Sequence, residues 1–149
     1  MRNKKESAYE GLQENIKGLK TPQIEVWENQ YQDKEYTICL DIPEFTCICP
    51  KTGLPDFAKI IILYSPHKYC IELKSFKMYT MFYRDIGIFH EHLTNKMLED
   101  FVSACKPRWA KITVEFNPRG GISTTVMREY WAKNHQVAKS QGHKATSKR

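Results

Sequence analysis

Apolar and polar residues alternate along the first half of the chain in a pattern that predicts strands. The segment EYTICLDIPEF, residues 35–45, alternates well enough for one strand, and FAKIIILYSP, residues 57–66, is a β-branched run that predicts a second. HKYCIELKS, residues 67–75, predicts a third, short strand. The period then changes to that of a helix with Ser75 as its N-cap and its end near Gly87. Its apolar stripe, at i, i+3, i+4 and i+7, consists of Phe76, Tyr79, Thr80 and Tyr83.

A second helix and two further strands follow. FHEHLTNKMLEDFVSACK, residues 89–106, carries one apolar helical face and ends before Pro107. WAKITVEF, residues 109–116, and ISTTVMREYWA, residues 122–132, predict two strands that the turn residues NPRGG join. The order strand, strand, helix, helix, strand, strand predicts an α+β fold, an antiparallel sheet with two helices on one face. Because the sheet edges lack protective features, pairing between subunits to close a barrel is one way to cover them.

The distribution of charge separates the C-terminal end from the rest of the chain. Residues 133–149 hold five Lys or Arg and no acid, so the remaining 132 residues carry 18 bases against 17 acids. The net charge of +6 is therefore mainly a property of this tail. Its last part, KSQGHKATSKR, residues 139–149, lacks apolar residues to pack, and the tail is expected to be disordered. We predict an N-terminal arm over 1–24, loosely held because its apolar positions are scattered, one folded domain over 25–132 and a basic tail over 133–149. Because the body is nearly neutral, we expect no direct nucleic-acid partner, and RNA binding by the tail is the weaker alternative.

The rest of the composition favours a cytoplasmic protein. No apolar run approaches the roughly 20 residues that a membrane-spanning helix needs. The charged start MRNKKESAYE is not followed by the apolar stretch of a secretory signal, so we expect no membrane partner. The cysteines are then expected to be thiols rather than disulfides. They are Cys39, Cys47, Cys49, Cys70 and Cys105.

Two of these thiols stand directly before a turn, in the segment FTCICPKTGLPD, residues 45–56. A thiol of ordinary pKa, about 8.5, needs a neighbouring group to become a good nucleophile at neutral pH. Asp56 follows a turn bent by two prolines and a glycine, so its carboxylate can return toward Cys49. The structural alternative is that Cys49 packs as a small apolar residue and Asp56 caps the turn. Cys47 is the competing thiol but lies farther from the turn, and the Cys-x-Cys spacing lacks the second pair that a metal site needs.

Charged residues gather at the predicted helix starts and in the last turn. His90 and Glu91 stand in the first turn of the second helix, where the helix dipole alone favours a carboxylate. A recognition role for Glu91 would use its two oxygens to accept two parallel N–H donors, such as those of a guanine edge. Lys74 and Lys77 lie where a helix start favours anions, or form an ordinary solvated face. Arg119, in the NPRGG turn, belongs to a plain hairpin or contacts a phosphate.

Four segments, taken together and in this order, resemble one family: the NADPH-dependent 7-cyano-7-deazaguanine reductases of queuosine biosynthesis, in their short, single-module form. Residues 72–79, ELKSFKMY, match the family signature Glu-x-Lys-Ser-hydrophobic-Lys-x-aromatic. CPKTGLPDF, FHE and PRGGI match as well, and the similarity covers roughly residues 25–131. The resemblance implies the tunnelling fold, in which units of this element order close barrels between the subunits of a homo-oligomer.

The resemblance also implies a reaction and a role for each matched residue. Cys49 would attack the nitrile carbon to give a covalent thioimide, and Asp56 would act as proton donor. Two molecules of NADPH would then supply the hydrides that give 7-aminomethyl-7-deazaguanine. Also implied are substrate binding by Ile71, Glu72, Leu73, His90 and Glu91, NADPH binding by Lys74, Lys77 and Arg119, and active sites at subunit interfaces without a metal. A function of another class also stays open, namely a pterin- or purine-binding module of the same fold without redox activity.

Overall fold

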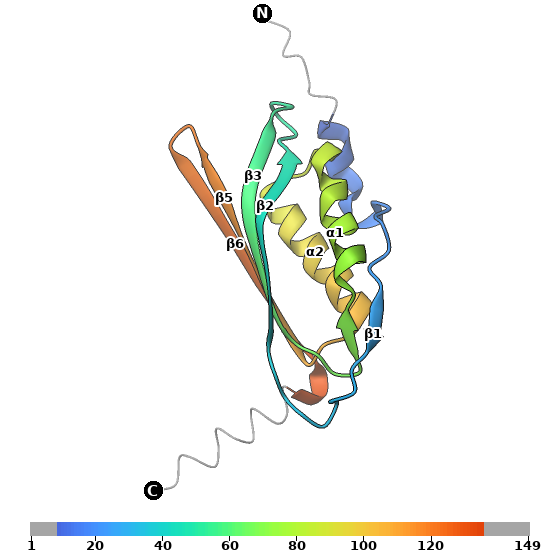
Figure 1. Cartoon of the computed structure of the whole chain (residues 1–149). Coiled ribbons are helices and arrows are strands. Elements are labelled where there is room, and N and C mark those ends of the chain that lie inside the picture. The colour runs from blue at the N-terminus through green and yellow to red at the C-terminus, as the bar shows by residue number, and fades with distance from the viewer. Residues whose placement is uncertain (1–8, 136–149) are drawn as a thin grey trace, which may run out of the picture.

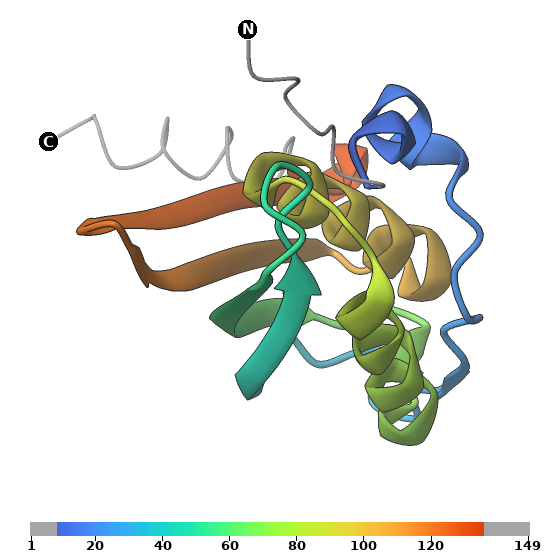
Figure 2. The same ribbon diagram turned by 90° about the horizontal axis from the view of Figure 1, so that it is seen from above.

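The main sheet of the chain is antiparallel and carries two helices on one face, as the sequence predicts (Figure 1). The computed structural model describes residues 9–135, and Figures 1 and 2 show both helices on the same side of the sheet. The sheet order is β2-β3-β5-β6, with antiparallel neighbours throughout. The elements are η1 (Glu10–Gly18), β1 (Val26–Glu28), β2 (Ile38–Ile48), β3 (Pro55–Ser65), β4 (Tyr69–Ile71), α1 (Leu73–Phe82), η2 (Tyr83–Asp85), α2 (His90–Cys105), β5 (Trp109–Arg119) and β6 (Ile122–Trp131).

The core lies between the sheet and the two helices. On β3, every second residue from Asp56 to Tyr64 is buried, which is the period of a strand with one covered face. Helix α2 adds an apolar stripe that packs against this face. The completely buried apolar residues include Ile60, Ile62, Leu93, Met97, Phe101, Ile112 and Val114. No helix among the described residues has the length and apolar character needed to cross a membrane.

Strand β2 contains a bulge that changes which of its residues face the core. Pairing with β3 runs regularly to Ile42 and Ile60 and resumes at Phe45 and Ala58, so β2 has one extra residue across this interval. The less exposed residues of β2 are therefore even-numbered up to Ile42 and odd-numbered from Phe45 onward. As a result, Cys47 lies in the core.

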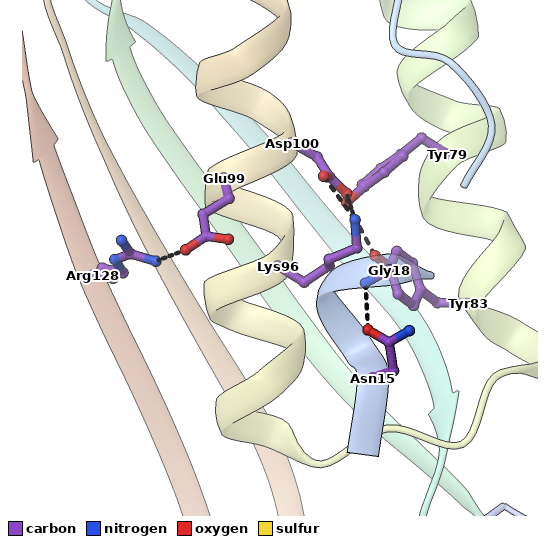
Figure 3. A network of polar contacts seen from close by, with 8 residues as sticks. All are labelled: Asn15, Gly18, Tyr79, Tyr83, Lys96, Glu99, Asp100 and Arg128. Carbon is purple, nitrogen blue, oxygen red and sulfur yellow. Dashed lines mark hydrogen bonds and ion pairs between the residues drawn. The ribbon is translucent and has the colours of Figure 1, made fainter. Parts of the chain in front are cut away.

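A polar network holds the two helices together. The Tyr79 hydroxyl donates to Asp100 Oδ2 at 2.7 Å. Lys96 Nζ donates to both oxygens of Asp100, at 2.8 and 2.9 Å, so the charge of this buried lysine is compensated. Figure 3 shows this network, and also an ion pair that joins α2 to β6. These contacts fix α2 on both sides, and with it the first turn that carries His90 and Glu91.

Helix α1 begins two residues before the predicted N-cap. Its N-cap is Glu72, whose carboxylate accepts hydrogen bonds from the N–H groups of Lys74 at 2.8 Å and Ser75 at 2.7 Å. The hydrogen bonds from Ser75 and then Lys74 lower the pKa of the Glu72 carboxyl group. The Ser75 hydroxyl instead donates to the Glu72 carbonyl and accepts the N–H of Glu25. The prediction of Ser75 as N-cap was therefore wrong.

The N-terminal arm is packed against the domain in its described part, residues 9–24, whereas the scattered apolar positions suggested a loosely held segment. Helix η1 contacts α2, and Ile16 and Ile24 are both buried in the main core. Strand β1, which the sequence analysis did not predict, pairs with β4 in a separate two-stranded sheet. Residues 1–8 of the arm and 136–149 of the predicted tail lie outside the described residues.

Candidate active site

Strand β2 ends one residue before Cys49, and a closed turn follows. The N–H of Cys49 donates to the carbonyl of Leu54 at 2.8 Å, and the N–H of Gly53 donates to the carbonyl of Cys49 at 2.8 Å. These two bonds close the segment PKTG between the strands. Cys49 is therefore held at the first position of the turn, where its side chain is only half-buried.

The two neighbouring thiols have opposite environments. Burial raises the pKa of Cys49, but hydrogen bonds from the Thr52 hydroxyl and from the backbone N–H groups of Thr52 and Lys51 outweigh it, so this pKa is lowered. Cys47 is completely buried, and burial, together with the charge of Asp56, raises its pKa to about 12. Because the thiolate is the nucleophilic form, Cys49 is the thiol suited to attack, whereas Cys47 packs as a small apolar residue.

Asp56 is a carboxylate at a core-facing position of β3. Its side chain is 4% exposed, and its two oxygens have different partners. Oδ1 forms an ion pair with Arg119 Nη1 at 2.9 Å, and Oδ2 lies 3.2 Å from His90 Nε2. Because desolvation of an isolated carboxylate is costly, these two partners are what permit a charge at this depth.

The first turn of α2 supplies the other polar groups. The ring of His90 stacks on the buried ring of Phe116, with 3.5 Å between centroids and 5° between planes, which fixes the imidazole beside Asp56. Glu91 is exposed, and its carbonyl accepts a hydrogen bond from Asn95 Nδ2 at 2.8 Å. Within residues 9–135 its carboxylate has no hydrogen bond or ion pair with another side chain. This carboxylate is therefore available to a ligand.

The loop before α2 joins the two halves of the site. The N–H of Ile48 donates to the carbonyl of Ile86, and the N–H of Ile88 donates to the carbonyl of Ile48, both at 3.0 Å. This isolated parallel bridge ties β2 to Gly87. Because Ile48 directly precedes the nucleophile candidate, the bridge sets the spacing between the thiol and the first turn of α2.

These groups line one cavity of about 240 Å³. A nucleophile, a buried carboxylate and an adjacent imidazole are together suited to add a thiol to an electrophilic carbon and to move the proton that this addition releases. The exposed carboxylate at the cavity mouth is suited to hydrogen-bond donors. The lining residues are Cys49, Pro50, Asp56, Ile88, Phe89, His90, Glu91 and Arg119.

The predicted substrate residues Ile71, Glu72 and Leu73 do not line this cavity. The segment from β4 into α1 lies at the lower end of the view in Figure 1, and the turn between β2 and β3 lies at the upper end. The N–H of Ile71 donates to the Tyr64 hydroxyl at 3.1 Å, and that of Glu72 donates to the carbonyl of Glu25 at 2.9 Å. Leu73 is 61% exposed. These three residues and Cys49 do not meet within one chain.

The three cations predicted to bind NADPH are also not brought together in one chain. Lys74 and Lys77 are exposed on α1, and Lys77 borders a cavity between α1 and β2. Arg119 instead enters the site from the β5–β6 hairpin and binds Asp56. The structure therefore groups Arg119 with Asp56 and His90 and not with the two lysines.

Sequence reasoning missed the Asp56–Arg119 ion pair and the contribution of Phe116. One signal was present, because Asp56 is in phase with Ala58 and Ile60, so a carboxylate occupies an apolar position of a strand. Phe116 is likewise the last buried residue in the alternation of β5. Neither pattern says which partner lies opposite.

Comparisons with known proteins agree with this geometry. A family model described as QueF-like protein matches residues 55–135. Proteins named NADPH-dependent 7-cyano-7-deazaguanine reductase are similar over most of their length. The protein of Elusimicrobium minutum is 52% identical over 111 residues, 74% of this chain and 83% of that protein. The protein of Halorhodospira halophila is 54% identical over 107 residues, 72% of this chain and 91% of that protein.

A solved structure agrees as well. The crystal structure of the archaeosine synthase QueF-Like in the apo form superposes with a TM-score of 0.60 at 25% sequence identity. The match covers 64% of this chain and 94% of that one, which confirms the predicted α+β tunnelling fold. The chain belongs to the QueF family, the family of the NADPH-dependent 7-cyano-7-deazaguanine reductases.

Proposed function

We propose that this protein catalyses the NADPH-dependent reduction of 7-cyano-7-deazaguanine to 7-aminomethyl-7-deazaguanine, a step of tRNA queuosine biosynthesis. Relatives that are 52% and 54% identical carry this activity in their names. The observation that carries the proposal is a thiol of lowered pKa, Cys49, in one cavity with the buried carboxylate of Asp56. A pterin- or purine-binding module without redox chemistry would have no use for this pair, and the relatives' names favour the reductase.

The first step is proposed to be covalent. The sulfur of Cys49 attacks the nitrile carbon, a C–S bond forms, and one π bond of the nitrile breaks with its electron pair moving to nitrogen. The proton of the thiol passes to Asp56 and from there to the nitrogen, so a neutral thioimide forms without a further reactant. The hydrogen bonds that lower the pKa of Cys49 stabilise the thiolate before the attack.

Arg119 and His90 are proposed to support Asp56 in this role. The guanidinium, 2.9 Å from Oδ1, holds the carboxylate in place beside the cavity, and the imidazole, 3.2 Å from Oδ2, is a second group able to carry the proton. The remaining conversion takes up two hydrides and two protons. The C–S bond breaks after the first hydride has been added, and the thiolate of Cys49 is the leaving group.

NADPH supplies the two hydrides when bound. Lys74 and Lys77 are proposed to contact its phosphates, and they fit this role because they are exposed and three residues apart on one helix. Arg119 is proposed as a third contact only after its ion pair with Asp56 has opened. No metal is proposed in the reaction.

Recognition of the deazaguanine edge is proposed for Glu91, with His90 beside it. The Glu91 carboxylate is exposed at the cavity mouth, and its two oxygens match two parallel N–H donors. We propose that Ile71, Glu72 and Leu73 complete the site from a neighbouring subunit of a homo-oligomer. Their separation from Cys49 within one chain supports this arrangement (Figure 1). So do the outer edges of β2 and β6, which pair with no further strand among residues 9–135, apart from the bridge at Ile48.

Intact mass spectrometry of the protein mixed with the nitrile in the absence of NADPH tests the proposal. Because addition of the thiol loses no atoms, the expected gain equals the whole mass of the substrate. The gain should disappear in Cys49→Ala and persist in Cys47→Ala, a matched change two residues away. An unchanged mass of the parent protein, or an adduct that survives in Cys49→Ala, would contradict the proposed mechanism.

A further inference from the structure

We propose that Gln13, in the N-terminal helix η1, is a positioning residue for the substrate-recognition side of the active site. The inference rests on the function proposed above for His90 and Glu91. Gln13 lies outside residues 55–135, which the family model matches, and outside all four segments that resemble the reductases. Its side chain nevertheless reaches the loop before α2, 74 positions farther along the chain.

Both ends of the Gln13 carboxamide are engaged by this loop. Nε2 donates to the carbonyl of Gly87 at 2.7 Å, and Oε1 accepts the N–H of Phe89 at 3.2 Å. His92 Nδ1 lies 3.2 Å from the same oxygen. A carboxamide has one donor and one acceptor side, so it pairs here with the carbonyl and the N–H of two residues that are two positions apart. This geometry is that of a clamp on the loop.

The clamp replaces a helix cap that α2 lacks. Phe89 is the N-cap of α2 and makes no side-chain cap bond. In a capping box, Glu or Gln at the third helical position accepts the N–H of the N-cap residue. That position is His92 in α2, and Gln13 supplies the acceptor from the arm. The carboxylate of Glu91 is thus not needed for capping and stays available to the substrate.

The arm and the nucleophile strand hold the loop from two sides. A Cβ added at Gly87 would overlap the Cβ of Tyr9, so glycine at this position is what lets the arm pack here. Ile48, the residue before Cys49, makes two backbone hydrogen bonds to the same loop. A loop released by the arm would therefore change the position of the first turn of α2 relative to the thiol.

Gln13→Met tests the clamp, because it removes the hydrogen bonds to Gly87 and Phe89, together with the contacts to His92 and to the carbonyl of Tyr9, and keeps an unbranched side chain of similar length. Each neutral hydrogen bond changes an equilibrium constant by a few-fold to about tenfold. Apparent affinity falls in proportion to the share of molecules whose loop is in place. We expect the KM for the nitrile to rise about tenfold, while kcat and the KM for NADPH stay within about twofold of the parent.

Lys17→Met is the matched control, because Lys17 is exposed on the same helix. Lys17→Met should leave kcat, the KM for the nitrile and the KM for NADPH unchanged. Gln13→Glu, a second variant, keeps the acceptor for Phe89 but sets a carboxylate against the carbonyl of Gly87, so we expect a smaller rise in the KM for the nitrile. Equal rises in both KM values, or an unchanged KM for the nitrile in folded Gln13→Met, would overturn the inference.

Hydrogen exchange of the Phe89 amide, followed by NMR without any ligand, gives a reading independent of activity. We expect this amide to exchange faster in Gln13→Met than in the parent or in Lys17→Met. Unchanged exchange would overturn the clamp. If the parent neither binds nor reduces the nitrile, the proposed function fails, whereas the exchange of Phe89 still decides whether Gln13 holds the loop.

Discussion

Replacing Asp56 with asparagine removes one buried charge at almost constant volume. Its effect on stability follows from the two contacts of the carboxylate. The amide oxygen can accept from the Arg119 guanidinium and the amide nitrogen can donate to His90, so both contacts can remain as hydrogen bonds that are weaker because the acceptor side has lost its charge. Arg119 is 39% exposed, so it is not left as an isolated charge in the core. Removing the desolvation cost of the carboxylate offsets part of the loss.

These terms predict a small change in stability and a large change in rate. Charge-assisted hydrogen bonds contribute about 1.5–3 kcal/mol and neutral ones about 0.5–1.5 kcal/mol. After the gain in desolvation we expect a net loss of about 1 kcal/mol, which lowers Tm by about 2–4 °C for a chain of this length. General acid–base assistance is typically about 10²- to 10⁴-fold, or about 2.7–5.5 kcal/mol of barrier. The catalytic effect should therefore exceed the effect on stability several times.

The assay compares NADPH oxidation in the presence of the nitrile with thermal unfolding of the same samples. Asp33→Asn is the matched control, because Asp33 is exposed before β2, pairs with Lys34 at 3.4 Å and lines neither the Cys49 cavity nor the cavity beside Lys77. This control should keep the parent turnover. If Asp56→Asn turns over within a few-fold of the parent, the carboxylate is only part of an ion pair. If the fraction of Asp56→Asn that is unfolded at the assay temperature accounts for its loss of turnover, the substitution acts through stability and not through catalysis.

Three further predictions concern the thiols, the substrate and the subunits. The rate at which iodoacetamide labels Cys49 should reach half its maximum at a lower pH than for an ordinary thiol, because the pKa of Cys49 is lowered. Cys47, of pKa about 12, should stay unlabelled in the native protein, and peptide mapping that finds equal labelling of both thiols would contradict this. Glu91→Gln sets an N–H donor against a donor of the substrate at a cost of about 1–3 kcal/mol, so calorimetry should show weaker binding of the nitrile and unchanged binding of NADPH. Equal losses for both ligands would assign Glu91 a structural role. Subunits of Cys49→Ala and Lys77→Glu, each of low activity, should regain part of it when mixed and reassembled, and light scattering that shows an active monomer would refute shared sites.

The sheet and both helices could be predicted because their signals are local. Alternation in β3 and the helical stripe that begins at Phe76 each depend only on near neighbours. The β5–β6 hairpin is a similar case, since Gly120 and Gly121 have φ values of 59° and 78°, which a two-residue hairpin turn requires. The greater exposure of Cys49 compared with Cys47 could also be predicted, from its position next to a turn.

The features that could not be predicted depend on contacts between distant segments. Ser75 has the side chain that N-cap statistics favour, yet Glu72 caps the helix. The Ser75 hydroxyl accepts the N–H of Glu25, 50 positions away, and no local pattern signals that bond. Strand β1 has only three residues, too few to show an alternating pattern, and it is a strand because it pairs with β4. The ion pair between Asp56 and Arg119 likewise depends on where the β5–β6 hairpin lies relative to Asp56 on β3, which no local pattern gives.

The bulge in β2 limits how the length of this strand can change over evolution. Pro43 and Glu44 are exposed, so many residue types would fit there without disturbing the core. Deleting one residue between Ile42 and Phe45 would nevertheless exchange the two faces of the strand beyond that point, because side chains alternate with a period of two. Cys47 would then face away from the core, and the turn that holds Cys49 would begin from the wrong face. Point substitutions at the bulge are therefore far easier to accept than insertions or deletions, although the bulge itself takes no part in the chemistry.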